Sequence, residues 1–162
     1  MQEFMYSDKG LALTKNFEGL RLEAYQDSVG VWTVGYGHTG PGVAEGMTVT
    51  DAEAEALLLA DLEDAVRCVN RKVTATISQG QFDAMVDFCF NAGRGNFLQS
   101  TLLRKVNSGD FAGAAAQFGL WVHAGGEVVP GLVRRRQAEA EMFSGESTTS
   151  AQPNSFAASL AK

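Results

Sequence analysis

Apolar residues recur at helical spacing over most of this chain and at strand spacing over one short part of it. Near the N-terminus, Leu13, Phe17 and Leu20 recur at intervals of four and three residues, which predicts one face of a helix. Asp8 can cap the start of this helix, and Gly19 is a suitable residue to end it. The first element is therefore expected to be a short helix.

Alternation replaces the helical pattern from residue 21. Polar and apolar side chains alternate through "RLEAY", "DSVG" marks a turn, and "VWTVGY" is rich in β-branched and aromatic residues. This pattern predicts a small antiparallel sheet. If the turn is centred on Gly30, Asp27 and Thr33 lie opposite each other across the strand pair. Gly30, Gly35 and Gly37 are expected to serve turn geometry or a close approach of the main chain.

The chain reads as helical from residue 50 onward. "TDAE" at Thr50–Glu53 is a capping box that opens a long helix, and "SQGQ" at Ser78–Gln81 is a second capping box that opens another. Pro130 suits the first turn of a late helix, and Gly145 suits its C-terminal end. Further helices are expected over residues 101–107, 111–122 and 130–143.

These elements define an α+β fold in one domain, residues 1–145. We expect a small antiparallel sheet lobe (about 18–48) and a larger helical lobe (about 78–145), joined by a long helix (about 50–72). A cleft between the two lobes is the expected place for a ligand. The segment 146–162 is rich in small polar residues and is expected to be poorly ordered.

Composition narrows the class of protein. The 162 residues are 45% hydrophobic and 20% charged, which is ordinary for a globular domain. The net charge is −6 and the one basic run is Arg134–Arg136, so we expect no general binding to nucleic acid. No apolar run approaches the roughly 20 residues of a membrane span, and no signal peptide is recognisable. Cys68 and Cys89 are expected to be buried hydrophobic side chains rather than a disulfide.

Two acids and a hydroxyl near the N-terminus can divide the work of glycoside hydrolysis. Glu18 lies at the C-terminal end of the first helix among apolar neighbours, where weak solvation and the helix dipole favour a protonated acid. Asp27 lies in the more polar setting of a strand end and suits the role of carboxylate, with the hydroxyl of Thr33 beside it. On spacing alone, a capped helix and a simple Asx-turn are equally good explanations.

A longer motif adds to this interpretation. Glu18, eight residues, Asp27, five residues, Thr33 and then "GYGH" resemble the catalytic signature of phage-type lysozymes, the endolysins that cut bacterial peptidoglycan. The likeness continues through "QFDAMVDFCFNAGRGNF", "STLLRKVNSGDF" and "WVHAGGEVVPGLVRRR" and covers about residues 7–145. It implies a lysozyme-like fold without metal or organic cofactor, with Glu18 as general acid, Asp27 as the carboxylate facing the sugar and Thr33 as a holder of the attacking water. The implied target is the β-1,4 bond between N-acetylmuramic acid and N-acetylglucosamine.

Two further site residues are expected. The resemblance implies that an arginine of the late helix lies near the catalytic acid, and we assign Arg135, among Arg134–Arg136, as the partner of Glu18. The same basic run could attract the negatively charged polymer to an acidic protein. His38 either lines the cleft or, as we favour, holds the sheet lobe together through a hydrogen bond or ion pair.

Three other functions remain open from the sequence. A lytic transglycosylase also uses a glutamic acid, but Asp27 and Thr33 favour the use of water. A zinc amidase would need a cluster of His and Cys ligands, whereas the chain has two of each. A non-catalytic wall-binding module is disfavoured by the intact set of acids and hydroxyl. We expect a monomer that acts on glycan strands, made in the host cytoplasm and released to the periplasm or cell wall by a holin.

Overall fold

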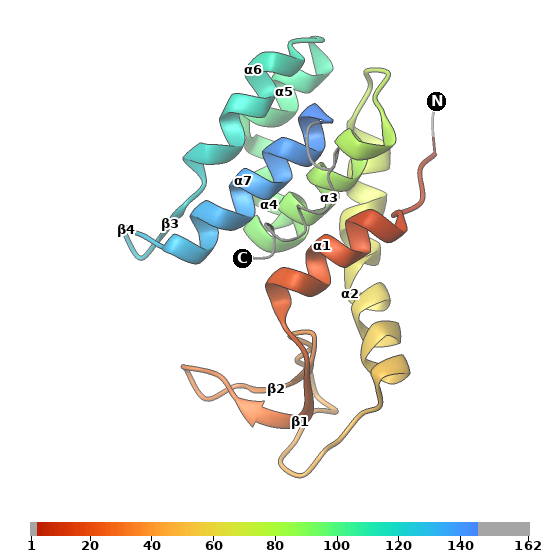
Figure 1. The fold of residues 1–162 in the computed structure, drawn as a ribbon, viewed down its shortest axis with the longest axis vertical. Helices are drawn as coiled ribbons and strands as arrows, with labels where there is room; N and C mark the ends of the chain where they lie inside the picture. Colours follow the sequence, from red (N-terminus) through yellow and green to blue (C-terminus); the bar gives the residue numbers. More distant parts are fainter. Residues whose placement is uncertain (1–2, 146–162) are drawn as a thin grey trace. The chain divides into compact units, whose positions relative to one another are not determined.

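The structure is a computed structural model that describes residues 3–145 (Figure 1). The chain divides into two compact units, which we call the sheet unit (residues 11–64) and the helical unit (residues 3–10 and 65–145). The disorder expected for residues 146–162 lies outside the described residues. Among the helices described, none combines the length and the apolar character that crossing a membrane requires.

The sheet unit is built from two helices and a strand pair. It contains most of α1 (Asp8–Glu18), the strands β1 (Arg21–Gln26) and β2 (Trp32–Gly35), and the first part of α2 (Asp51–Lys72). The remaining residues of α1 and α2 belong to the helical unit. The predicted order of helix, antiparallel strand pair and long helix is confirmed (Figure 1).

Side-chain caps set the starts of both helices. The hydroxyl of Ser7 accepts a hydrogen bond from the Gly10 amide at 3.2 Å, so the cap of α1 is Ser7 and not the expected Asp8. At α2 the predicted capping box is confirmed. The Thr50 hydroxyl accepts from the Glu53 amide at 3.1 Å, and the Glu53 carboxylate accepts from the Thr50 amide at 2.9 Å.

The register of the strand pair differs from the expectation. β1 and β2 place Tyr25 opposite Thr33, and the Asp27 amide donates to the Val31 carbonyl at 2.9 Å. Asp27 therefore lies opposite Val31, and the prediction that it faces Thr33 is wrong. The cause is the turn, in which the Gly30 amide donates to the Asp27 carbonyl at 2.9 Å and Gly30 has a φ of +89°. Gly30 is the last, left-handed residue of a three-residue loop and not its centre.

A third extended segment completes the sheet unit. The Ala24 amide donates to the Met47 carbonyl at 2.8 Å, and the Val49 amide donates to the Leu22 carbonyl at 2.9 Å. The return chain therefore pairs with β1 on the edge that β2 leaves free. The buried core beneath these strands consists of Val34, Val43, Val49 and Ala54.

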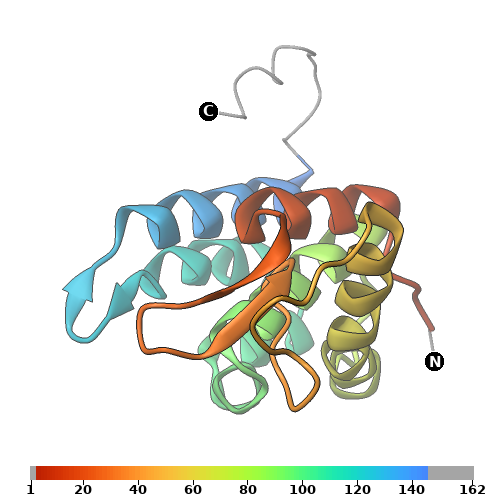
Figure 2. The ribbon, with the colours of Figure 1, turned by 90° about the horizontal axis from the view of Figure 1, so that it is seen from below.

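The helical unit is built around a helix whose central residues, from Phe82 to Cys89, are buried. Its later elements are α3 (Gln79–Ala92), α4 (Arg94–Gln99), α5 (Thr101–Asn107), α6 (Phe111–Gln117), the 3₁₀ turn η1 (Phe118–Leu120), β3 (His123–Ala124), β4 (Glu127–Val128) and α7 (Pro130–Ser144). α3 packs against α7, and α5 packs against α6 (Figure 1). The β3–β4 hairpin, cyan to light blue in Figure 2, leads into α7.

The helical unit differs from the prediction in three places. The helix expected over residues 111–122 ends at Gln117 and tightens into η1. α4 and the β3–β4 hairpin were not expected, because six-residue helices and two-residue strands are too short to show a period. The second capping box is confirmed, since Ser78 and Gln81 exchange both of its hydrogen bonds at the start of α3.

Aromatic side chains fill the core of the helical unit. The ring of Phe88 meets those of Phe118 and Trp121 edge-on, with centroids 5.7 and 5.5 Å apart. Cys68 on α2 and Cys89 on α3 are buried, as expected. At the N-terminal end of the unit, Phe4 stacks on Phe82 with centroids 4.9 Å apart.

Candidate active site

Glu18 is the last residue of α1 and lies against the glycine-rich turn that follows β2. The helix ends because Gly19 adopts a φ of +75°, and its amide donates to the Lys15 carbonyl at 3.0 Å. Leu20, expected on the apolar face of the helix, lies beyond this end and is exposed. The Glu18 side chain is half-buried, and a Cβ placed on Gly37 would lie 2.8 Å from its Oε1 atom. The structure therefore brings Glu18 and the "GYGH" stretch together.

Asp27 is held by the main chain of its own turn. Its Oδ1 atom accepts hydrogen bonds from the amides of Val29 at 2.9 Å and Val31 at 2.8 Å. These bonds fix the direction of the carboxyl group. No donor to the other oxygen, Oδ2, occurs among the described residues, and the side chain is half-buried. Asp27 thus has one oxygen committed to structure and a second that can act on a ligand.

Thr33, on β2, binds Val31, the residue whose amide donates to Asp27. Its hydroxyl donates to the Val31 carbonyl at 3.0 Å, and the side chain is 4% exposed. Asp27 and Thr33 are therefore linked through one residue, Val31, although they are not directly opposite each other. Because its proton is used in this bond, the Thr33 hydroxyl can only accept from a further partner.

His38 has the role that the sequence favoured. Its Nδ1 atom lies 2.9 Å from Oδ2 of Asp61 on α2, within the sheet unit. The main chain of His38 exchanges two hydrogen bonds with Val34 on β2, each of 2.9 Å. His38 therefore ties the turn after β2 to both the strand and α2. Its use as a substrate contact stays a prediction.

The arginines of α7 lie in the helical unit, and two of the three are buried. Arg135 is 4% exposed and Arg136 is 1% exposed, whereas Arg134 is exposed. The Nε and Nη2 atoms of Arg135 donate to the two carboxylate oxygens of Asp87, each at 2.9 Å. The expectation that the whole run offers positive charge to the polymer is wrong, because buried acids hold two of its members. The pairing of Arg135 with Glu18 stays a prediction.

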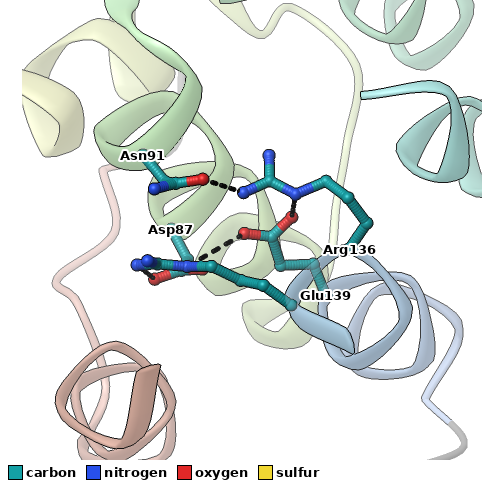
Figure 3. Close-up of polar contacts among 5 residues, drawn as sticks. Asp87, Asn91, Arg136 and Glu139 are labelled. Atoms are coloured by element: carbon teal, nitrogen blue, oxygen red, sulfur yellow. Dashed lines mark hydrogen bonds and ion pairs between the residues drawn. The ribbon is translucent and has the colours of Figure 1, made fainter. Parts of the chain in front are cut away.

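A buried acid of α7 completes this cluster (Figure 3). Glu139 is fully buried, and its Oε1 atom lies 3.2 Å from Nε of Arg136, whose Nη2 atom donates to Asn91. Burial, followed by the nearby Asp87, raises the pKa of Glu139 well above its ordinary value. Burial also lowers the pKa of Arg136. Sequence reasoning missed Asp87 and Glu139; the spacing of Glu139 from the arginines, one helical turn, was the available signal.

The comparisons with known proteins agree with this fold. The phage lysozyme family model matches residues 15–139. An endolysin of Acyrthosiphon pisum secondary endosymbiont phage 1 is 43% identical over 141 residues, which cover 85% of this chain and 96% of that protein. A SAR-endolysin of Bacteriophage PS119 is 45% identical over 125 residues, 77% of this chain and 75% of that protein.

A solved structure extends the likeness to three dimensions. A crystal structure of a variant of P22 lysozyme superposes with a TM-score of 0.80 at 39% identity, covering 86% of this chain and 98% of the other. A small antiparallel sheet followed by a helical unit is the arrangement of a lysozyme-like glycoside hydrolase. The chain belongs to the phage lysozyme family. It is a muramidase that degrades peptidoglycan in phage lysis.

Proposed function

We propose that Glu18, Asp27 and Thr33 carry out hydrolysis of the β-1,4 bond between N-acetylmuramic acid and N-acetylglucosamine. The observation that carries this proposal is the shared anchoring of Asp27 and Thr33 on Val31. The resemblance of Glu18, Asp27 and Thr33 to the family's catalytic signature supports it. A mere Asx-turn would explain the bonds to Asp27, but it would not require a buried hydroxyl tied to the same residue.

The two acids have different tasks in this reaction. Glu18 gives its proton to the glycosidic oxygen as the bond to the anomeric carbon of the muramic acid breaks. Positive charge then develops on that sugar ring, and the carboxylate of Asp27 stabilises it. One bond breaks, and the leaving sugar departs with the proton that Glu18 supplied.

Water completes the reaction at the anomeric carbon. Oδ2 of Asp27 and the hydroxyl oxygen of Thr33 are both acceptors, so a water molecule bound to both uses its two protons and keeps a lone pair for attack. As its oxygen bonds to the carbon, one of its protons passes to Asp27. Asp27 acts here as a general base, and Thr33 orients the water without changing its own protonation.

The products of digestion test this chemistry directly. Purified peptidoglycan is digested with the full chain, and the fragments are analysed by mass spectrometry before and after borohydride reduction. Reducing muropeptides are expected. Fragments with a 1,6-anhydro ring would show a transglycosylase that closes the sugar on itself, and freed stem peptides would show an amidase. Peptidoglycan that stays intact while it sediments with the protein would show a wall-binding module.

We also propose that the enzyme is made in the host cytoplasm and reaches the wall through a holin pore. The support is the location of its substrate, which lies outside the inner membrane. Turbidity is followed in bacteria that express the chain with or without a holin. Rapid lysis is expected only with the holin, and equally fast lysis without it would contradict the proposed route.

A further inference from the structure

The turn that follows β2 is fastened to its surroundings at several points within the sheet unit. Val34 and His38 exchange two main-chain hydrogen bonds of 2.9 Å, which close the turn, and His38 pairs with Asp61 at 2.9 Å. The ring of Tyr36 lies under the ammonium group of Lys15, 5.6 Å from the ring centroid. Because of these contacts, the turn has little freedom to shift when a side chain packs against it.

The ammonium group above Tyr36 is itself held. Nζ of Lys15 donates to Oε1 of Glu55 on α2 at 2.5 Å. Lys15 lies one helical turn before Glu18 on α1, so the same helix that carries the acid also carries the contact to Tyr36. The turn and the end of α1 are therefore fixed relative to each other by side chains, in addition to the main chain that joins them.

Gly37 is the point of this turn that meets the acid. A Cβ atom on Gly37 would lie 2.8 Å from Oε1 of Glu18, closer than a Cβ atom approaches another heavy atom in real proteins. The φ of Gly37, +80°, is also a conformation that residues with a side chain rarely adopt. The space that the missing side chain leaves is where the carboxyl group of Glu18 lies.

We propose that Gly37 is a positioning residue of the reaction, and that its bare main chain holds the carboxyl group of Glu18 in the direction needed for proton transfer. The inference rests on the proposed role of Glu18 as the acid. A side chain at position 37 would turn the carboxyl group away, and misplacement by about 1 Å can lower a rate by about 100-fold. Binding of the polymer would be little affected, because the contact is made to the acid.

Gly46 provides the matched control. It lies in the same unit with a φ of +88°, and no atom lies within 4 Å of a Cβ placed there. Alanine therefore meets the same backbone strain at Gly46 as at Gly37, but without the contact to Glu18. We expect Gly46→Ala to lower the melting temperature by a few degrees and to leave kcat near that of the unmodified chain. Gly37→Ala should lower the melting temperature further and reduce kcat by about 10- to 100-fold with little change in KM.

A double-variant cycle tests the contact between Gly37 and Glu18 through melting temperatures alone. Its result therefore does not depend on whether Glu18 is the catalytic acid. In a Glu18→Ala background the space beside residue 37 is empty, and the extra loss of melting temperature in Gly37→Ala over Gly46→Ala should disappear. An extra loss that persists, or equal kcat values for the two glycine variants, would overturn the inference alone. A Glu18→Gln variant that still lyses walls would instead overturn the proposed function, and this inference with it.

Discussion

Removing the charge of Arg135 tests how much the buried cluster of the helical unit contributes to stability. The cluster consists of Asp87, Arg135, Arg136 and Glu139. Arg135→Met keeps the length of the side chain but leaves Asp87, which is fully buried, without its two charged hydrogen bonds of 2.9 Å. Breaking a buried pair in this way costs about 3–5 kcal/mol, out of a total stability of about 5–15 kcal/mol for a domain. For a chain of this size the loss corresponds to a fall in melting temperature of roughly 6–20 °C.

The neighbouring arginine is the matched control. Arg134 is exposed, so Arg134→Met should change the free energy of unfolding by less than about 0.5 kcal/mol. Both variants are measured by urea unfolding and by thermal circular dichroism. If the two substitutions destabilise the protein equally, the pair with Asp87 does not carry the energy that its geometry implies.

A second substitution distinguishes structure from catalysis at Arg135. With both charges removed, Asp87→Leu/Arg135→Met should recover a large part of the stability that either single change loses. Its lytic rate is then measured well below its melting temperature. A rate far below that of the unmodified chain would support the predicted pairing of Arg135 with Glu18. A normal rate would show that Arg135 serves only the cluster.

The remaining predictions concern the sheet unit. Glu18→Gln should reduce wall lysis to near background with an unchanged or raised melting temperature, since general acid catalysis is commonly worth about 10²- to 10⁴-fold; near-normal lysis would refute the assignment. Asp27→Ala should lose most activity and Thr33→Ala less, as measured by release of reducing ends. His38→Gln should lower the free energy of unfolding by about 1 kcal/mol, because its pair with Asp61 is partly exposed. An unchanged value in urea unfolding would show that this pair contributes nothing.

Local sequence predicted those parts of the fold whose hydrogen bonds are local. The capping boxes at Thr50 and Ser78 each join residues three positions apart, and both occur as the sequence indicated. The strand register, in contrast, was predicted wrongly. The cause is also local, because Gly30 is the last residue of the loop and not its centre. The loop is therefore centred on Val29, one residue before Gly30, and this moves the partner of Asp27 from Thr33 to Val31. The predicted contact was wrong, while the catalytic roles of Asp27 and Thr33 stay predictions.

The buried cluster shows what local pattern cannot provide. Asp87 and Arg135 are 48 positions apart, and neither periodicity nor capping rules indicate that they meet. In the sequence Arg135 and Arg136 form a basic run, for which exposure to solvent is the ordinary expectation. The pairing depends on how α3 and α7 pack, which is a property of the assembled core and not of either helix.

Glu139 should make stability fall as pH rises. Its folded pKa is raised by burial and by Asp87, against the opposing effect of Arg136 and Arg135, so the folded chain keeps a proton that the unfolded chain releases near its ordinary pKa of about 4.3. Between these two pKa values the folded state binds more protons than the unfolded state, so each unit of rising pH removes up to about 1.4 kcal/mol from this group's contribution. Glu139→Gln cannot titrate and should be free of that loss. Urea unfolding of both proteins from pH 5 to 8 should therefore show the variant gaining stability relative to the unmodified chain as pH rises. If the difference in stability between the two proteins stays constant over this range, Glu139 is already ionised in the folded protein. The charges of Arg136 and Arg135 would then outweigh the effect of burial on its pKa.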